Sequence, residues 1–297
     1  MLPRDIAAAA AIVLLWSVNF SVNKIAVSQF PPVLMVAMRF ALIGAMLAPL
    51  LRPTGKPFWR IALIAFTLGG LHFGLFFSGL KGIGAGMSAI VTQLAVPFSA
   101  VLAAVFFRER TGLPQVAGMA LAFAGIYVIV GEPKLEFDAL HLGLAVASAL
   151  AFAAANIQIK LLGPVNGFVL NAWIAVLAAP QLAIVSLIGE ENQFAALAAA
   201  DWRGWSAMVF TTVSGGVVAY GLWYYLLGRY AVNRIVPLTL MAPAFAILIA
   251  GVVLNEPLTW KVLAGTALTL IGVAAIQLRQ ASSRKPGRRC DAKRDRS

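Results

Sequence analysis

Residues 91–130 read VTQLAVPFSAVLAAVFFRERTGLPQVAGMALAFAGIYVIV, and residues 237–276 repeat the pattern as PLTLMAPAFAILIAGVVLNEPLTWKVLAGTALTLIGVAAI. The aligned pairs are Pro97 with Pro243, Glu109 with Glu256, Gly118 with Gly265 and Gly125 with Gly272, 146 residues apart for the prolines and 147 for the others. Both copies are apolar enough to cross a bilayer. An internal repeat in a chain with many apolar spans is typical of a transporter whose site lies between the repeats.

The composition excludes a soluble protein. Of the 297 residues, 61% are hydrophobic and 11% are charged, and the mean hydropathy is +0.88, whereas charged residues make up about a quarter of a soluble domain. The single cysteine, Cys290, lies near the C-terminus, so we expect neither a disulfide framework nor a cysteine-based metal site. We predict an integral membrane protein that uses no metal and no cofactor.

Ten stretches are long and apolar enough to span a bilayer as helices. They cover residues 6–26, 32–51, 60–80, 86–107, 113–131, 140–160, 166–189, 204–227, 232–254 and 260–278. The first resembles a signal peptide but has no clear cleavage site, so we interpret it as a retained span. Because five spans fall in each half, the second half enters the membrane inverted.

The predicted fold is therefore all-α, with ten transmembrane helices arranged as a 5+5 inverted repeat around a central cavity. Residues 1–136 form the first repeat, residues 137–278 form the second, and residues 279–297 form a disordered basic tail on the cytoplasmic side.

Basic residues predict the orientation. Counting lysines and arginines in the short loops and at the ends of the spans gives 17 on the side of the chain termini and five on the other side, and nine against five without the tail. Since cytoplasmic loops carry the excess of basic residues, we expect both termini in the cytoplasm.

The net charge of +12 raises the question of a nucleic-acid partner. The tail RQASSRKPGRRCDAKRDRS resembles a nucleic-acid-binding arm. A solvated segment that enforces topology and touches anionic lipid headgroups explains the same residues. We expect membrane lipid, and no nucleic acid, as its partner.

Further motifs accompany the repeat. WSVNFSVNK contains Trp16, Asn19 and Lys24 in the first span, and AYGLWYYLLGRY contains Tyr220 and Trp223 in the eighth. With the paired pattern of proline, glutamate and glycine, these motifs make residues 6–278 resemble the EamA-type branch of the drug/metabolite transporter superfamily, and most of all its bacterial exporters of aromatic and other amino acids.

The resemblance implies a single-chain carrier. Its central cavity would be lined by spans 1, 3, 4, 6, 8 and 9, with spans 5 and 10 at the periphery. Relatives carry amino acids, related metabolites, sugar nucleotides, phosphorylated trioses or drugs. The family pattern thus implies a small-molecule substrate without naming it.

Polar side chains inside a span are candidates for the substrate site, because burying them in lipid is costly. Trp16, Asn19 and Asn23 lie at i, i+3 and i+7 on one helical face. That face would offer an indole and two amides to a zwitterionic substrate. The alternative is that the asparagines only bond neighbouring helices.

Tyr220, Trp223 and Tyr224 lie at i, i+3 and i+4, halfway along the eighth span and therefore too deep for a simple interfacial belt. They suit an organic solute with a variable side chain, although ordinary bundle packing would also explain them. The other predicted cavity residues are His72, Phe76, Phe77, Gln93 and Asn156, with Phe77 aligned to Trp223. His72 is either a proton relay or a hydrogen-bonded contact to the substrate.

Pro97 and Pro243 lie near the middle of their spans, where each removes a backbone hydrogen bond and kinks its helix. As symmetry mates in an inverted repeat, they are candidate gates or hinges, with static packing as the alternative. Glu109 and Glu256 fall in loops on opposite membrane faces and cannot share a substrate, so each is expected to brace a loop, Glu256 with Pro257 at the start of the last span. Arg39, inside the second span, would pair with a helix end, snorkel to the interface or contact an anion.

The residues that are missing narrow the function. No acidic residue lies well inside a predicted span, so the usual carboxylate route to proton antiport is absent. There is no phosphate-binding loop for ATP, no cluster for an enzyme and no continuous polar lining for a channel. Phosphate-bearing substrates would need more basic residues at the cavity.

We predict a monomeric transporter, not an enzyme, in the bacterial inner membrane. It would export aromatic amino acids, methionine, threonine or similar small metabolites by facilitative alternating access. The alternative is a proton-coupled exporter of cationic drugs or other metabolites.

Overall fold

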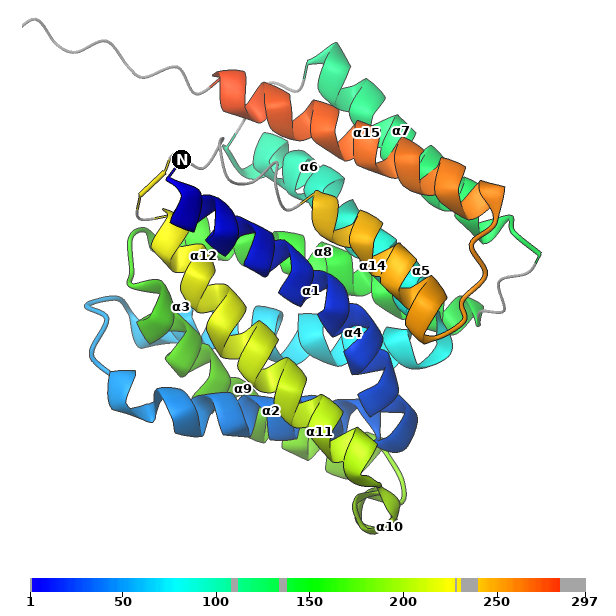
Figure 1. Cartoon of the computed structure of the whole chain (residues 1–297). Coiled ribbons are helices and arrows are strands. Elements are labelled where there is room, and N and C mark those ends of the chain that lie inside the picture. The colour runs from blue at the N-terminus through cyan, green and yellow to red at the C-terminus, as the bar shows by residue number, and fades with distance from the viewer. Residues whose placement is uncertain (1, 108–111, 134–137, 228, 231–239, 284–297) are drawn as a thin grey trace, which may run out of the picture.

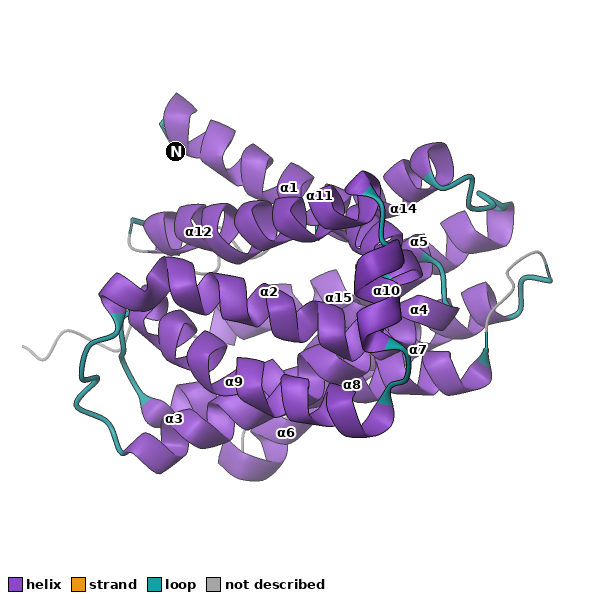
Figure 2. Ribbon diagram, turned by 90° about the horizontal axis from the view of Figure 1, so that it is seen from below, coloured by secondary structure: helices purple, strands orange, loops and turns teal. Residues whose placement is uncertain are grey.

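The computed structural model describes residues 2–107, 112–133, 138–227, 229–230 and 240–283. Within these ranges the regular structure is entirely helical (Figure 2). The helices are α1 (Pro3–Gln29), α2 (Pro32–Leu47), α3 (Phe58–Ile64), α4 (Phe73–Gly82), α5 (Ala85–Val91), α6 (Ala95–Phe107), α7 (Leu113–Val130), α8 (Ala139–Leu162), α9 (Gly167–Gly189), α10 (Gln193–Ala199), α11 (Trp202–Thr211), α12 (Tyr220–Leu227), α14 (Met241–Val253) and α15 (Trp260–Ser283). Short segments η1 (Ala48–Leu50), η2 (Ala65–His72), η3 (Thr92–Leu94) and η4 (Thr212–Ala219) complete them.

In the described part of the chain, nine continuous helical stretches are long and apolar enough to cross a membrane. The tenth predicted span, 232–254, contains α14, whose described length is 13 residues, while residues 231–239 lie outside the described ranges. The all-α membrane class is confirmed, and the tenth span stays a prediction. The first helix begins at Pro3, earlier than predicted, and so includes Asp5.

Successive spans run in alternating directions, so the molecule has two ends (Figure 1). The end that carries Pro3 and Ser283 is called the proximal end. The opposite end, with the connections 29–32, 82–85, 130–139, 189–202 and 253–260, is called the distal end.

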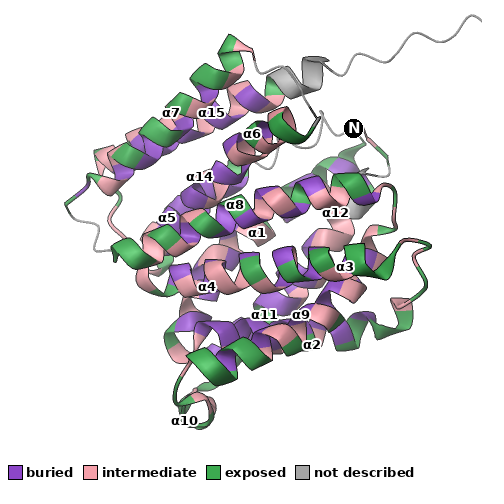
Figure 3. Ribbon diagram, turned by 180° about the vertical axis from the view of Figure 1, so that it is seen from behind, coloured by how far each residue is buried: buried purple, intermediate pink, exposed green. Residues whose placement is uncertain are grey.

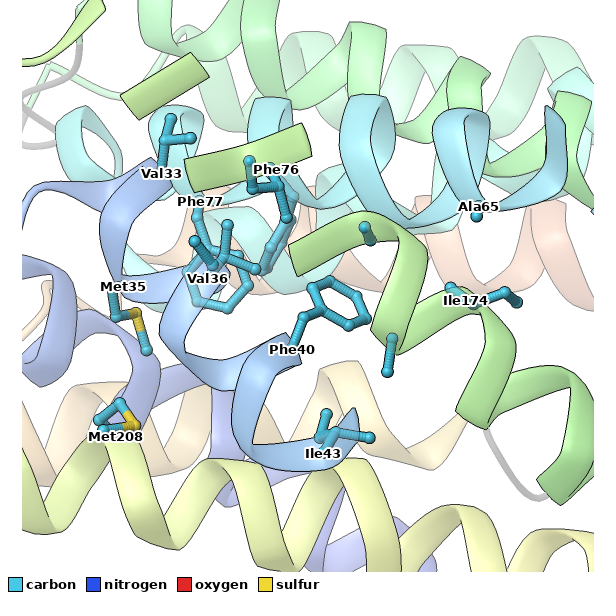
Figure 4. Packing of buried hydrophobic residues seen from close by; sticks show 14 of the residues in the cluster. Val33, Met35, Val36, Phe40, Ile43, Ala65, Phe76, Phe77, Ile174 and Met208 are labelled. Atoms are coloured by element: carbon cyan, nitrogen blue, oxygen red, sulfur yellow. The ribbon is translucent and has the colours of Figure 1, made fainter. Parts of the chain in front are cut away.

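Exposed residues lie on the outward faces of the helices (Figure 3), and many of them are large and apolar. Leu113 and Tyr127 on α7 and Ile188 on α9 are each at least 80% exposed. Such a surface is unfavourable in water and is expected where lipid is the solvent. Inside, one core cluster joins α2, α4, α9 and α11, with Phe40 and Ile174 among its members (Figure 4).

Two spans contain matching π-helical segments, η2 in the third span and η4 in the eighth. Each is eight residues long, and both their first and last residues lie 147 positions apart, from 65 to 212 and from 72 to 219. A π turn takes an extra residue and is frequent at functional sites. Under this offset Trp223 corresponds to Phe76, whereas the sequence alignment paired it with Phe77.

The fourth span is interrupted near Pro97. The 3₁₀ segment η3 separates α5 from α6, and Pro97 is the third residue of α6. A proline has no N–H for the carbonyl four residues earlier, here that of Gln93, so the regular helix breaks just before it. Pro243 is likewise the third residue of α14, but the segment before it lies outside the described residues.

The helices α7 and α15 pack side by side at the edge of the bundle (Figure 1). Their glycines allow the backbones to approach: a Cβ on Gly118 would lie 2.7 Å from the Gly272 carbonyl oxygen, and a Cβ on Gly125 would lie 2.5 Å from that of Gly265. Small residues permit such close packing between membrane helices. A shift of 147 positions takes Gly118 to Gly265 and Gly272 to Gly125, so the two contacts are related by the repeat.

Candidate functional site

Two adjoining chambers lie at the centre of the bundle. The central chamber has a volume of about 330 Å³, and the proximal chamber, which extends toward the proximal end, has about 410 Å³. Their shared wall consists of Arg39, Phe73, Phe152 and Tyr220. Volumes of this size match small-molecule sites.

Most of the predicted cavity residues lie on these walls. The central chamber is lined by Trp16, Asn19, Asn23, His72, Phe76, Gln93, Tyr220 and Pro243, and the proximal chamber by Asn156, Tyr220 and Trp223. Phe77 is fully buried and, like Pro97, lies on neither wall. The side chain of Tyr224 is outside the described part of the structure.

One aromatic cluster of the wall is formed by α1 and α12. The Trp16 ring lies 6.2 Å from that of Tyr220, edge to face, and 5.7 Å from that of Trp223. Aromatic pairs at these separations are mutually stabilising. The indoles and the phenol thus form one continuous surface beside both chambers.

The amides of α1 differ in their hydrogen bonding. Asn19 donates from Nδ2 to the Leu15 carbonyl at 2.6 Å and to Ser214 Oγ of η4 at 3.1 Å. Asn23 is buried, and its Oδ1 has no hydrogen-bond partner among the described residues. Asn19 therefore joins two spans, as the packing alternative predicts, while Asn23 keeps its amide oxygen for a ligand or water.

His72 is held by α8. Its Nδ1 lies 2.9 Å from the Ser148 carbonyl oxygen, which can only accept, so Nδ1 carries the proton. Its ring packs against Phe73 at 4.7 Å and Phe152 at 4.9 Å. This arrangement fits a hydrogen-bonded cavity residue whose remaining nitrogen, Nε2, is an acceptor.

Several wall residues, Arg39 and Gln277 among them, were not in the predicted set of cavity residues. Arg39 of α2 lines both chambers, and Gln277 of α15 lines the central one. The resemblance implied neither span 2 nor span 10 at the cavity. The signal was present for Arg39, because a charge inside a span marks a functional site by default.

Carboxylates and one lysine tie the distal end together. Glu256 accepts from the N–H groups of Ala85 at 2.5 Å and Gly86 at 3.0 Å, at the N-terminus of α5. This glutamate therefore braces the corner between spans 3 and 4, rather than the start of the last span as predicted. Glu109 lies outside the described residues.

Lys24 binds the other side of the same corner. Its Nζ donates to the carbonyls of Leu80 at 2.7 Å, Lys81 at 2.9 Å and Ile83 at 2.7 Å, at the C-terminus of α4. Cations are favourable at that end of a helix and anions at the other. The two charges thus match the dipoles of both helices at the corner.

Two further carboxylates link spans at the distal end. Glu190 accepts from the N–H of Val33 at 2.8 Å and of Leu34 at 2.9 Å, in the first turn of α2. Asp201 accepts from Gln29 Nε2 at 2.7 Å. That bond and a second from the Gly204 N–H hold the pKa of Asp201 below its usual range.

The proximal end has a smaller cluster. Asp5 is buried and accepts from the hydroxyls of Tyr230 at 2.6 Å and Tyr225 at 3.1 Å. These bonds join α1 to the end of the eighth span. In the described ranges, no group of three or more acidic, histidine or cysteine residues is placed to hold a metal ion.

Comparisons with known proteins agree with this architecture. A model of the EamA-like transporter family matches residues 4–131 and again 140–278. A probable amino-acid metabolite efflux pump of Salmonella typhimurium is 29% identical over 278 residues, covering 89% of this chain and 92% of that protein. A protein of Escherichia coli with the same description is 28% identical, covering 91% and 93%.

A solved crystal structure shares the fold, with a TM-score of 0.64 and 21% identity over 93% of this chain and 98% of that one. The nine apolar spans, the central chambers and the family match over both halves agree on a multi-pass membrane transporter of small molecules. The resemblance noted from the sequence is confirmed: this chain belongs to the EamA-like transporter family.

Proposed function

We propose that this transporter exports amino acids, such as aromatic residues, methionine or threonine, or similar small metabolites across the bacterial inner membrane. The observation that carries this proposal is the mixed wall of the chambers. Trp16, Tyr220 and Trp223 supply apolar surface with polar edges, and Asn23 supplies an amide oxygen that has no partner among the described residues. The descriptions of the Salmonella and Escherichia relatives point to the same substrate class.

Alternating access is the proposed mechanism, on a ten-helix 5+5 inverted repeat. Three features support the repeat: the matched segments η2 and η4, the exchanged glycine contacts of α7 and α15, and a pair of related hydrogen bonds. Asn19 bonds Ser214 in η4, while Gln158 bonds Thr67 in η2 at 3.0 Å, and Thr67 and Ser214 are again 147 apart. Rocking of one repeat against the other would expose the chambers to each side in turn.

Pro97 and Pro243 are the proposed hinges. Ser17 Oγ donates to the Ala242 carbonyl at 2.9 Å, next to Pro243, which couples α1 to the start of α14. With the termini in the cytoplasm, the proximal chamber would face the cytoplasmic side and load substrate for export. We propose a monomer without ion coupling.

Transport into proteoliposomes tests this proposal. The purified chain is reconstituted, and uptake of labelled aromatic amino acids, methionine and threonine is measured with and without a pH gradient. We expect amino-acid uptake that is saturable and independent of the pH gradient. Proton-driven uptake of cationic dyes in place of amino acids would favour the drug-export alternative.

A matched pair of variants locates the site. Trp223→Ala removes part of the chamber wall and should lower uptake by about tenfold, the effect of losing one large aromatic contact. Trp202→Ala removes an indole that is 73% exposed and should leave uptake unchanged. Equal uptake by the two variants would place the substrate elsewhere.

A further inference from the structure

Arg39 is the only charged side chain among the described residues that line the chambers. It is 8% exposed and lies eight residues into α2, deep in the bundle. Its position on the shared wall means that a solute in either chamber would meet the guanidinium group.

This charge has no carboxylate partner in the described part of the chain. No aspartate or glutamate there lies within ion-pair distance of Arg39, whose guanidinium lies instead over two aromatic rings. An ion buried without a partner is costly, so a buried cation is normally paired or part of a functional pathway. The unpaired charge thus points to an anion that is not part of the protein.

Aromatic rings hold the guanidinium in place. Its central carbon lies 5.9 Å from the ring centre of Phe73 and 5.7 Å from that of Phe77, within range of cation–π attraction. This gives a role to Phe77, which is buried behind the wall. A planar group supported on rings is suited to two parallel hydrogen bonds with a carboxylate.

The space in front of Arg39 is kept open by Gly215 of η4. A Cβ at this position would lie 3.3 Å from an Nη atom of Arg39 and 2.9 Å from Asn19 Oδ1. The glycine therefore leaves room where the guanidinium and an amide oxygen converge.

Acceptors for an ammonium group lie on the same chamber. Asn23 and Gln277 both line the central chamber, and their buried amide oxygens are unpartnered among the described residues. A cationic guanidinium together with unpaired amide oxygens is complementary to a zwitterion, and it repels an organic cation.

We propose that Arg39 binds the carboxylate of the transported solute, so that the substrates are zwitterionic or anionic amino acids and not organic cations. This inference rests on the transport function proposed above. It assigns a substrate-binding role to a residue that lies outside the motifs of the repeat.

Counterflow in proteoliposomes tests the proposal. Vesicles loaded with unlabelled L-methionine exchange it for labelled L-methionine, and inhibition is compared for L-methionine, its carboxamide and its N-acetyl derivative. The wild type should be inhibited by methionine at a concentration at least tenfold below that of the carboxamide, because the carboxamide loses the charge-assisted bonds. N-acetylmethionine, which keeps the carboxylate, should fall between them.

Three variants of the full chain complete the experiment. Arg39→Gln should bring the ratio of the inhibitory concentrations of carboxamide and methionine close to one. Arg39→Lys should keep part of the preference for methionine, because the charge remains without the planar fork. Arg60→Gln, at an exposed arginine of α3, should behave as the wild type. Thermal unfolding without ligand should show Arg39→Gln at least as stable as the wild type, since it removes an unpaired buried charge.

The outcomes separate this inference from the transport proposal. A wild type with methionine flux, and an Arg39→Gln variant that still prefers methionine over its carboxamide, would overturn the role of Arg39 and leave transport intact. Without flux, the same ligand pairs are scored by thermal stabilisation. If the ligands that carry a carboxylate stabilise the wild type but not Arg39→Gln, the role of Arg39 is supported even without flux. If they do not stabilise the wild type, the role of Arg39 is rejected.

Discussion

The two ends of the bundle are held together by different chemistry. At the distal end, Glu190 and Glu256 accept hydrogen bonds from backbone N–H groups at helix N-termini, and Lys24 donates to carbonyls at a helix C-terminus. Each of these bonds joins two different spans. At the proximal end, the clearest links between spans are the tyrosine hydroxyls on Asp5. The proximal chamber extends toward that end. Over the described residues, these links support a shape that is closed at the distal end.

The largest effect is expected from Glu256→Ala. It leaves two N–H groups of α5 without their acceptor, which should lower the free energy of unfolding by about 1–3 kcal/mol. It should also open the distal end, so that a cysteine at Asn23, in a chain carrying Cys290→Ser, reacts faster with an impermeant maleimide from the distal side. Glu191→Ala, at an exposed neighbour of Glu190, is the control, and equal labelling of both variants would contradict the comparison.

Lys24→Met should have the next largest effect, lowering the free energy of unfolding by about 1 kcal/mol because three carbonyls lose their donor. Lys24 and Glu256 hold the two sides of one corner, so the double variant should lose less than the sum of the single losses. Thermal unfolding of the four proteins measures this. Additive losses would show that the corner is not a unit, and Lys81→Met controls for an exposed lysine there.

Asp5→Asn tests the proximal end. The amide is a weaker acceptor than the carboxylate, so the bonds from Tyr225 and Tyr230 should weaken and the loss of thermal stability should be smaller than for Glu256→Ala. Labelling of the Asn23 cysteine from the distal side should not rise. A distal increase as large as that of Glu256→Ala would show that both ends open together.

The smallest effect concerns pH and Asp201. Because its pKa is lowered in the folded protein, the stability it contributes is present above the unfolded value of about 3.9 and is lost as pH falls through the folded value. The difference in thermal stability between the wild type and Asp201→Asn should therefore be constant from pH 7 to pH 5 and shrink below about pH 4. A decrease already at pH 5 would assign the pH response to another group.

Much of the fold could be predicted because hydropathy over about 20 residues is a local signal. The helix break at Pro97 could also be predicted, because the missing N–H of a proline affects its own helix. The sequence alignment paired Trp223 with Phe77 because it carried the offset of 146 from the prolines into this span. The matched π segments give an offset of 147, which pairs Trp223 with Phe76. The partner of Glu256 was also hidden, because it depends on which spans meet in space.

The candidate site also contains residues that could be predicted from the sequence and residues that could not. Trp16, Asn19 and Asn23 share a face by helical periodicity alone, and all three lie on the central chamber. Arg39 could not be assigned from its sequence position, since a charge inside a span can snorkel, pair or face a cavity. The structure places it on the wall of both chambers, with no carboxylate within ion-pair distance in the described part of the chain.

The π segments determine the direction in which the aromatic side chains that follow them point. One residue turns an α-helix by about 100°. Deleting a single residue from η2 would thus swing Phe73 and Phe76 away from the chambers while leaving the length and hydropathy of the span almost unchanged. The same holds for Tyr220 and Trp223 after η4. The shape of the binding wall can therefore be altered by a change in residue number alone, with every aromatic side chain of the wall kept.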